Sequence, residues 1–556
     1  MSATNSGYSP RVLRPGENQL RWLMATLSGL AIALSFPQPG LAGLAWIAPA
    51  GLLFAALGRP PAAAFRIGYL GGFVQQLVGL GWLLAIPFPG GNVAAWLALS
   101  AYVALYQGLW VMLSLALIGT RRPDSTPGGW LEHADGLLNL PLIRRILWPL
   151  LCAANWAGLE IIQSHFLSGF PWNMLGTSQY SMTPVIQIAS FTGVYGVSFL
   201  LVWTAVSLGM ALLRITRQPT ARWGWMGDLR FPLLVVVIIG CMGMVRLTRQ
   251  PGVPPTTLKV AMVQPSIPQE LIWDEAADAE RFNDVMRLSE LALATGPDLL
   301  IWPESAFARA TRERYQAISS MISLHGAWMI FSSEDVAPHP SNADSADYDV
   351  FNAAFLLNPE GALDAIYHKQ RLVIFGEYVP LSDWLPFLRK LTPIEGGFTP
   401  GRGPVTFRLK DPDVAASVLI CFEDVFAHGA RQHVHSGLQL FINLTNNGWF
   451  GEGSAQWQHA AAGVFRAVEN GIPLVRATNN GLTCWIDGFG RLREWIGRES
   501  GDIYGPGFLT ASVEIPPPDR ELTFYTRHGD VFGWTCAALL VLPLIRLRYA
   551  KGRTRL

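Results

Sequence analysis

The segment AASVLICFED (residues 415–424) decides the fold of the second half of this chain, because small and apolar residues run without a break up to Cys421. A short continuous apolar run of this kind predicts a strand that is buried on both faces. Two other segments have the same form. DLLIWPES (298–305) carries Glu304 near its end, and LDAIYHK (363–369) ends at Lys369. Three buried strands would therefore each end in one ionisable side chain.

Strands and helices alternate around these segments. Further strands are predicted over 258–266, 327–335 and 438–447, and helices over 275–295, about 311–324, and 456–470. Pro359, Glu360 and Gly361 separate two strand-like runs and so predict a hairpin. This alternation predicts an α/β domain whose sheets are covered by helices.

The three strand ends combine groups that covalent catalysis requires. A thiol is a weak nucleophile until it is deprotonated, so a catalytic cysteine needs a base, and a cation stabilises the thiolate and the oxyanion. Glu304 can supply the base, Lys369 the cation and Cys421 the nucleophile. Each residue alone would be read as a surface charge or a core thiol; the three together indicate an active site.

Cysteine usage leaves one alternative open. Of the five cysteines, Cys152, Cys241 and Cys536 lie in apolar stretches, where cysteine behaves as a small hydrophobic residue. Cys421 and Cys484 lie in the α/β part and could instead form a disulfide. The sequence has no CxxC, no His/Cys cluster with metal-ligand spacing and no GxGxxG after a strand, so we expect neither a metal nor another cofactor.

The net charge of +1 over 556 residues is the sum of unequal parts. Residues 1–246 carry a net charge of +8, residues 247–528 carry −11, and residues 529–556 carry +4. The chain is 50% hydrophobic and only 15% charged, which is short of the roughly 25% typical of soluble proteins. This composition excludes an intrinsically disordered chain and argues against a nucleic-acid-binding protein.

The two cationic parts are apolar enough to form membrane spans. A helix that crosses a bilayer needs roughly 20 apolar residues. Eight stretches qualify as candidates: 20–36, 41–58, 67–87, 93–119, 147–166, 190–213, 231–246 and 530–547. The competing interpretations are buried helices of a large soluble protein and, for the first stretch, a cleaved signal peptide.

Arginines support the membrane interpretation because they occur on alternate connections. The connections 37–40, 88–92 and 167–189 contain no Lys or Arg, whereas the other connections between the spans are Arg-rich. The positive-inside rule then places both termini in the cytoplasm. It predicts a transmembrane domain over 1–246 with seven helices, a catalytic domain over 247–528 on the opposite side, and a last helix with a basic cytoplasmic tail over 529–556.

One carboxylate lies inside a predicted span. Glu160 is within 147–166, with Gln163 and His165 closer to the outer end of the same span. An intramembrane carboxylate is either functional or a polar contact that holds helices together. The sequence leaves these two roles open.

IWPES (301–305), HKQRLVIFGEYVPL (368–381) and ICFED (420–424) resemble the Glu, Lys and Cys motifs of the nitrilase, or carbon–nitrogen hydrolase, superfamily. Together with the apolar spans, SGFPWNMLG (168–176) and SIPQELIWDE (266–275), the whole chain is similar to the bacterial apolipoprotein N-acyltransferases. The resemblance implies an α-β-β-α sandwich on a multi-pass helical membrane domain of the bacterial inner membrane. The second domain would be periplasmic.

The resemblance also implies roles for individual residues. Glu304 would be the general base and acid, Lys369 the stabilising cation and Cys421 the nucleophile. Supporting roles would fall to Glu377 and Glu423, and to Phe422, which replaces the usual tyrosine. Aromatic contacts to lipid or to a lid would come from Trp273, Trp449 and Trp384, the last within a lid-like stretch at 381–401.

The implied reaction moves a fatty acyl chain from a phospholipid, with phosphatidylethanolamine the expected donor, to the N-terminal amine of a diacylated apolipoprotein. We expect a monomer, because no heptad seam is present. Two alternatives remain: a membrane-tethered amidase that hydrolyses a C–N bond, and a binding protein on a degenerate nitrilase fold. The second alternative predicts loss of a triad residue, and none is lost.

Overall fold

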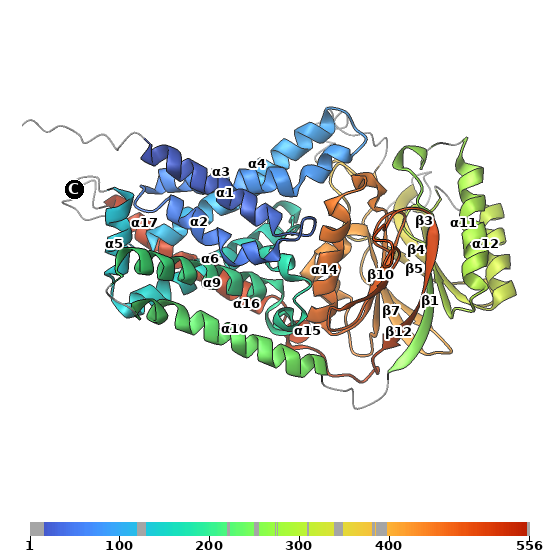
Figure 1. Cartoon of the computed structure of the whole chain (residues 1–556). Helices are drawn as coiled ribbons and strands as arrows, with labels where there is room; N and C mark the ends of the chain where they lie inside the picture. The colour runs from blue at the N-terminus through green and yellow to red at the C-terminus, as the bar shows by residue number, and fades with distance from the viewer. Residues whose placement is uncertain are drawn as a thin grey trace, which may run out of the picture.

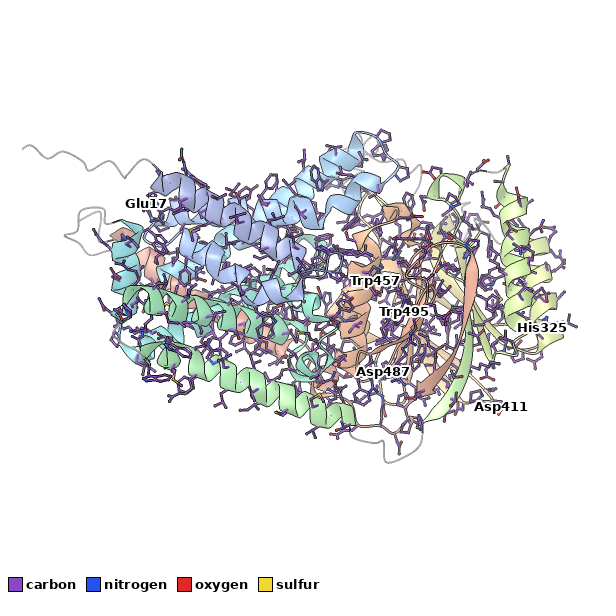
Figure 2. The ribbon with its side chains drawn as sticks, viewed as in Figure 1. Glu17, His325, Asp411, Trp457, Asp487 and Trp495 are labelled. Atoms are coloured by element: carbon purple, nitrogen blue, oxygen red, sulfur yellow. The ribbon has the colours of Figure 1, made fainter. Side chains whose placement is uncertain are left out.

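The structure is a computed structural model that describes residues 16–118, 129–219, 223–248, 255–272, 274, 276–307, 311–338, 348–380, 384 and 397–552. A bundle of long helices forms one half of the molecule, and an α/β unit forms the other (Figure 1). Glu17, on the first helix, and His325, on an outer helix of the α/β unit, lie at opposite ends of the molecule (Figure 2).

The first and last parts of the chain build the helical half. Its main helices are α1 Glu17–Leu34, α2 Ala48–Ala55, α3 Pro61–Gly79, α4 Gly91–Ala116, α5 Trp130–Leu138, α6 Leu142–His165, α9 Val194–Arg217, α10 Gly224–Thr248, α16 Val531–Leu539 and α17 Val541–Gly552. Short helical turns connect them: η1 Ala42–Trp46, η2 Gly81–Ala85, η3 Phe166–Ser168, η4 Leu175–Gln179, α7 Thr183–Ile186 and α8 Ala189–Thr192.

Five helical segments of the described chain are long and apolar enough to cross a membrane. They are Gly91–Ala116, Leu142–Ser168, Val194–Arg217, Gly224–Thr248 and Val531–Arg548. Gly224–Thr248 is the most exposed of these, since only 11% of its apolar window is buried within the protein. A helix that is apolar on all sides and yet exposed suits a lipid environment. The chain is thus a membrane protein, and the total of eight spans stays a prediction.

The candidate span 41–58 differs from the expectation of one continuous helix. Ile47 (φ −130°, ψ −45°) separates η1 from α2. Pro49 then lies in the first turn of α2, where a missing backbone N–H costs nothing, whereas it would break a helix that continued through it. The stretch therefore packs inside the bundle as a short turn followed by an 8-residue helix.

The α/β half contains two six-stranded sheets, ordered β12-β1-β2-β3-β4-β5 and β11-β10-β9-β8-β7-β6. Their strands are β1 Thr256–Gln264, β2 Leu299–Ile301, β3 Trp328–Pro338, β4 Tyr348–Leu357, β5 Leu363–His368, β6 Thr406–Leu409, β7 Val414–Ile420, β8 Leu440–Thr445, β9 Leu474–Thr478, β10 Cys484–Ile486, β11 Leu492–Trp495 and β12 Gly507–Ile515. Within each sheet three neighbouring strands are parallel, β1–β3 in one and β7–β9 in the other.

The two sheets pack face to face, with helices on both outer faces. Apolar residues of β1, β2, β7 and β8 share one buried cluster between the sheets. The helices α11 Asp278–Leu293 and α12 Arg312–His325 pack on the first sheet through a second cluster. On the outer face of the second sheet lie α13 Ala427–Gln432 and α14 Ser454–Asn470. This is the expected α-β-β-α sandwich.

The helix α14 lies between the second sheet and the membrane helices (Figure 1). Of its 17 residues, 15 are buried. One apolar cluster joins residues of α6 and α9 to residues of α14, β7 and β8. Trp457 on α14 packs against this cluster and is labelled in Figure 2. The helical bundle and the sandwich therefore share a continuous core.

Candidate active site

Cys421 follows the last residue of β7 and starts the short turn η7 Cys421–Val425. Its φ is +54°, a backbone conformation that non-glycine residues adopt rarely and that is strained for them. The side chain of Asn443 on β8 donates to the carbonyl of Cys421 at 2.8 Å and to that of Leu419 at 3.1 Å. The neighbouring strand therefore holds the strained turn that carries the thiol.

A buried cluster of one cation and two carboxylates lies beside the thiol. Lys369 Nζ is 3.1 Å from Glu304 Oε1 and 2.8 Å from Glu377 Oε1. Asn352 on β4 donates from the same Nδ2 to Glu304 Oε1 at 2.9 Å and to Glu377 Oε1 at 2.8 Å. The charges of Glu304, Lys369 and Glu377 all act on Cys421. The structure therefore brings the three predicted strand-end residues together.

Backbone donors fix the orientation of both carboxylates. The N–H of Asn446, which follows β8, donates to Glu304 Oε2 at 3.1 Å, and the N–H of Val373 donates to Glu377 Oε2 at 2.8 Å. Glu304 and Lys369 come from the first sheet, whereas Cys421 and Asn446 come from the second. The carboxyl ends of strands from both sheets thus meet at one site.

Glu423 connects the lysine segment to the cysteine turn. Its Oε1 accepts from the backbone N–H groups of Gln370 at 2.8 Å and Arg371 at 3.0 Å. Its Oε2 accepts from the backbone N–H of Ile420 at 2.7 Å, and the hydroxyl of Tyr367 lies within 3.0 Å of both oxygens. One carboxylate therefore positions the residues that adjoin both Lys369 and Cys421.

Burial controls the charge states of the nucleophile and the cation. Burial, together with the charge of Glu304, raises the pKa of the Cys421 thiol to about 12, although Lys369 opposes the increase. Burial disfavours the charged form of Lys369, but Glu304 and Glu377 outweigh it and hold the pKa of the lysine well above its ordinary value. The resting site therefore contains a neutral thiol and an ammonium group.

A second ionic network lies behind the cysteine turn. Arg476 Nη1 donates to Asp424 Oδ2 and to Asn443 Oδ1, both at 2.8 Å. His459 Nε2 is 2.7 Å from Asp424 Oδ1. These side chains are completely buried. Because Asn443 holds the carbonyl of Cys421, the network supports the nucleophile through one intermediate residue.

The aromatic residues named from the sequence lie in different surroundings. The Phe422 ring centre is 5.9 Å from Lys369 Nζ, so the ring packs at the site although the tyrosine hydroxyl is lost. Trp449 is half-buried in the turn η8 Asn447–Phe450, and Trp384 is 86% exposed. Trp273 lies outside the described residues, as does most of the stretch 381–401.

Sequence reasoning missed Asn352 and Asn443. Each is an asparagine within an otherwise largely apolar strand, VFNAAFLL and LFINLT. Asparagine is depleted in strands, so an isolated asparagine in an apolar strand is the signal that the sequence offers. Neither segment indicated which group the amide would bind, because the partners are distant in sequence.

The disulfide alternative is wrong, because all five cysteines are free. Within the described residues one group could present metal ligands, since atoms of His165, His428 and Asp530 lie within 4.8 Å of one another. Arg371 Nη2 is 2.8 Å from His428 Nε2. A guanidinium can only donate, so the proton of a neutral His428 resides on Nδ1, which is then a donor and not a ligand. We assign no metal to this group.

Comparisons with known proteins cover both halves of the chain. The model of the apolipoprotein N-acyltransferase N-terminal domain matches residues 28–207, and that of the carbon–nitrogen hydrolase domain matches residues 259–505. The apolipoprotein N-acyltransferase of Geobacter metallireducens is 36% identical over 93% of each chain. That of Bradyrhizobium diazoefficiens is 31% identical over 88% of this chain and 87% of its own.

Among solved structures, an amidase from Nesterenkonia sp. is 18% identical and covers 50% of this chain and 94% of its own, with a TM-score of 0.35. The two relatives cover 93% and 88% of this chain, and so include both the helical half and the sandwich. This chain belongs to the apolipoprotein N-acyltransferase family.

Proposed function

We propose that this protein transfers a fatty acyl chain from a phospholipid to the α-amine of the diacylglyceryl-cysteine at the N-terminus of an apolipoprotein, through a thioester on Cys421. The observation that carries the proposal is the buried Glu304–Lys369–Glu377 cluster at the cysteine turn. It occurs in a chain whose relatives are apolipoprotein N-acyltransferases. A thiol, a base and a cation together are suited to acyl transfer.

The first half-reaction loads the enzyme. Glu304 takes the proton of the Cys421 thiol while the sulfur attacks the ester carbonyl of the phospholipid. This transfer leaves the total charge of the cluster unchanged, which suits a site where burial strongly disfavours an additional anion. The tetrahedral intermediate then collapses, Glu304 returns the proton to the departing lysophospholipid oxygen, and the acyl group stays on sulfur.

Lys369 stabilises the oxyanion of that intermediate, together with backbone N–H groups near Phe422. Its ammonium group is already desolvated and held by Glu304 and Glu377, so little reorganisation is needed when negative charge develops. The side chain of Asn352 donates to the same two carboxylate oxygens as Lys369. We assign Asn352 a positioning role.

The second half-reaction uses the same residues in reverse. The neutral α-amine of the lipoprotein attacks the thioester carbonyl, an amide forms, and the Cys421 thiolate leaves. The proton lost by the amine passes to Glu304, or to Glu377, and then returns to sulfur. Both half-reactions share one site, so we expect ping-pong kinetics.

Membrane placement follows from the substrates, which keep their acyl chains in the bilayer. We assign residues 1–246 to a transmembrane domain, 247–528 to a periplasmic catalytic domain, and 529–556 to a last span with a cytoplasmic tail. The alternation of arginines supports this orientation. Trp449, Trp384 and Trp273 are the aromatic residues that we expect to contact lipid near the site.

The central test combines purified protein, phospholipid and a diacylated lipopeptide. Cys421→Ala should abolish both the thioester and the N-acylated product, since no nucleophile remains. Cys484→Ala is the matched control, because Cys484 is also a buried, free cysteine of the sandwich and should be dispensable. Product formation by Cys421→Ala at the rate of the control would refute the mechanism.

The same assay separates acyl transfer from hydrolysis. Release of free fatty acid without acylated lipopeptide would favour the amidase-like alternative, in which water replaces the amine. For the donor, we expect phosphatidylethanolamine to exceed phosphatidylglycerol at equal acyl composition. For the assembly state, we expect light scattering of the detergent-solubilised protein to give one chain per particle.

A further inference from the structure

Glu160 in α6 is a buried carboxylate without a charged partner. It is 7% exposed, and within the described residues no Arg, Lys or His pairs with it. An ionised carboxylate inside a membrane bundle costs several kcal/mol unless a cation balances it. The helices therefore contain a buried carboxyl group that stays neutral unless a cation from outside the described chain balances its charge.

The contacts of Glu160 satisfy only one of its oxygens well. Oε1 accepts from the indole N–H of Trp156 and from the backbone N–H of Leu175, both at 2.8 Å. The hydroxyl of Ser198, which accepts from the N–H of Gly176, lies near the carboxylate. These groups are neutral donors. Oε2 has no hydrogen-bond partner.

A cavity begins at this carboxylate. It lies between α3, α4 and α6, is partly open, and has a volume of about 20 Å³, which is room for one small polar group of the size of a water molecule or an ammonium group. Gln75 of α3 and Gln107 of α4 line it, and Oε1 of each is buried and lacks a hydrogen-bond partner. Trp110 and Trp156 also line it, with ring centres 4.8 Å apart.

The polar atoms of this cavity fit one kind of ligand. Glu160 Oε2, Gln75 Oε1 and Gln107 Oε1 are acceptors without donors. A rotated glutamine amide could present its nitrogen instead. Glu160 is the one carboxyl group among the described residues that line the cavity, and the charge it can carry is negative, so a charged ligand that it binds is a cation. A primary ammonium group has three N–H donors and one positive charge, and indole faces attract such cations.

We propose that the cavity between α3, α4 and α6 binds a primary ammonium group, with Glu160 as its counter-ion and Gln75 and Gln107 as hydrogen-bond acceptors. The group can belong to a soluble amine or to a lipid headgroup. None of the residues of the catalytic cluster lines this cavity. The site is therefore separate from the thioester chemistry, and the proposal does not depend on it.

The cavity adjoins the contact between the bundle and the sandwich. Asn173, which lines it, donates to Gln458 Oε1 on α14 at 3.1 Å, and Trp172 Nε1 donates to the same oxygen at 2.9 Å. The next residue, His459, binds Asp424 behind the cysteine turn. A bound ammonium group would thus stabilise the part of the bundle on which the catalytic half rests.

The test measures thermal unfolding of the full-length protein in detergent. Methylammonium chloride should raise Tm by about 2 °C relative to sodium chloride at equal ionic strength, as expected for a ligand well above its Kd. Tetramethylammonium, which has no N–H, should not. In mixed micelles, phosphatidylethanolamine should raise Tm above phosphatidylcholine if the ammonium group is carried by lipid.

Three substitutions test whether the increase in Tm arises from binding in the cavity. Glu160→Gln should abolish it, and Gln107→Met should reduce it, which keeps the test decisive if the first variant fails to fold. Asn155→Leu is the matched control, because Asn155 is a buried amide on the same helix that contacts Ser114 and does not line the cavity.

The results distinguish a soluble amine from a lipid headgroup as the source of the ammonium group. A shift with methylammonium alone indicates a soluble amine, and a shift with phosphatidylethanolamine indicates a lipid headgroup. Equal shifts with sodium and methylammonium, no shift with any probe, or an unchanged shift in Glu160→Gln would each overturn the proposal. Unfolding is measured without acyl transfer, so the result is independent of the proposed activity.

Discussion

Replacing Glu423 with glutamine should slow the formation of the thioester, although Glu423 does not take part in the chemistry that we propose. Its carboxylate accepts from Gln370 N and Arg371 N on one oxygen and from Ile420 N on the other, with the Tyr367 hydroxyl near both. An amide has only one acceptor oxygen. At least one backbone N–H then faces an NH₂ group instead of an acceptor.

In Glu423→Gln, the orientation that loses fewer hydrogen bonds keeps the amide oxygen next to the N–H groups of Gln370 and Arg371. The 2.7 Å hydrogen bond from the N–H of Ile420 is then lost. A hydrogen bond to a charged group contributes about 1.5–3 kcal/mol. Ile420 adjoins the strained Cys421, so this cost falls on the turn that carries the nucleophile. If the lost free energy raises the activation barrier in full, the rate of thioester formation falls roughly 10- to 150-fold.

The assay is the single-turnover rate of acyl transfer from a fluorescent phospholipid to the protein, with unfolding followed in parallel. Glu452→Gln is the control, because it makes the same chemical change at an exposed position of the sandwich. A general loss of stability would lower the amount of folded enzyme and leave the single-turnover rate of the remainder unchanged. A wild-type rate in folded Glu423→Gln would refute the positioning role.

Three further outcomes follow from the geometry. Because burial raises the pKa of Cys421 to about 12, the rate at which iodoacetamide labels Cys421 in the resting enzyme should still increase about tenfold per pH unit above pH 9. A labelling rate that becomes constant below pH 9 would contradict the buried thiol. Burial lowers the pKa of His433 to about 4, below its ordinary 6.5, so its contribution to stability is complete above pH 6.5 and is lost as the pH falls towards 4. The free energy of unfolding, measured with denaturant, should fall by about 1.4 kcal/mol for each pH unit in that window. In His433→Gln the free energy of unfolding should depend less on pH. Trp172→Ala removes a buried ring that packs on Trp82 and Phe450, so unfolding should become about 3–5 kcal/mol easier; a loss below 1 kcal/mol would show that this contact between bundle and sandwich is unimportant.

The sequence predicted the three strand ends that meet at the site, and the strands that lead to Glu304 and Cys421 are buried as expected. The prediction of a third buried strand is wrong, because β5, which leads to Lys369, contains Asp364 and is a partly exposed edge strand. The family resemblance added Glu377, which lies 2.8 Å from Lys369. Asn352 and Asn443 were not predicted, since a single asparagine in a strand does not reveal its partner on another strand.

Two further parts of the fold were not predicted from the sequence. The edge strands β6 and β12 are defined by pairing with distant segments, as when β12 pairs with β1 across about 250 residues. Buried and exposed residues alternate in TFRL and in ASVEI, so a strand signal was present, but it did not reveal the partner strand. The stretch 41–58 is apolar enough for a span, and only the position of Pro49 in the first turn of α2 indicates where the helix starts.

The burial of α14 on two sides means that the catalytic half is not a detachable module. An enzyme tethered by a linker could be released as a soluble domain by cutting the chain between α10 and β1 and again before α16. Here such an excision would expose the apolar face that α14, β7 and β8 share with α6 and α9. Large apolar surfaces of this kind cause aggregation in water. Biochemical work on this protein therefore requires the whole chain in a membrane mimetic, and the bundle acts as the structural foundation of the sandwich as well as its anchor.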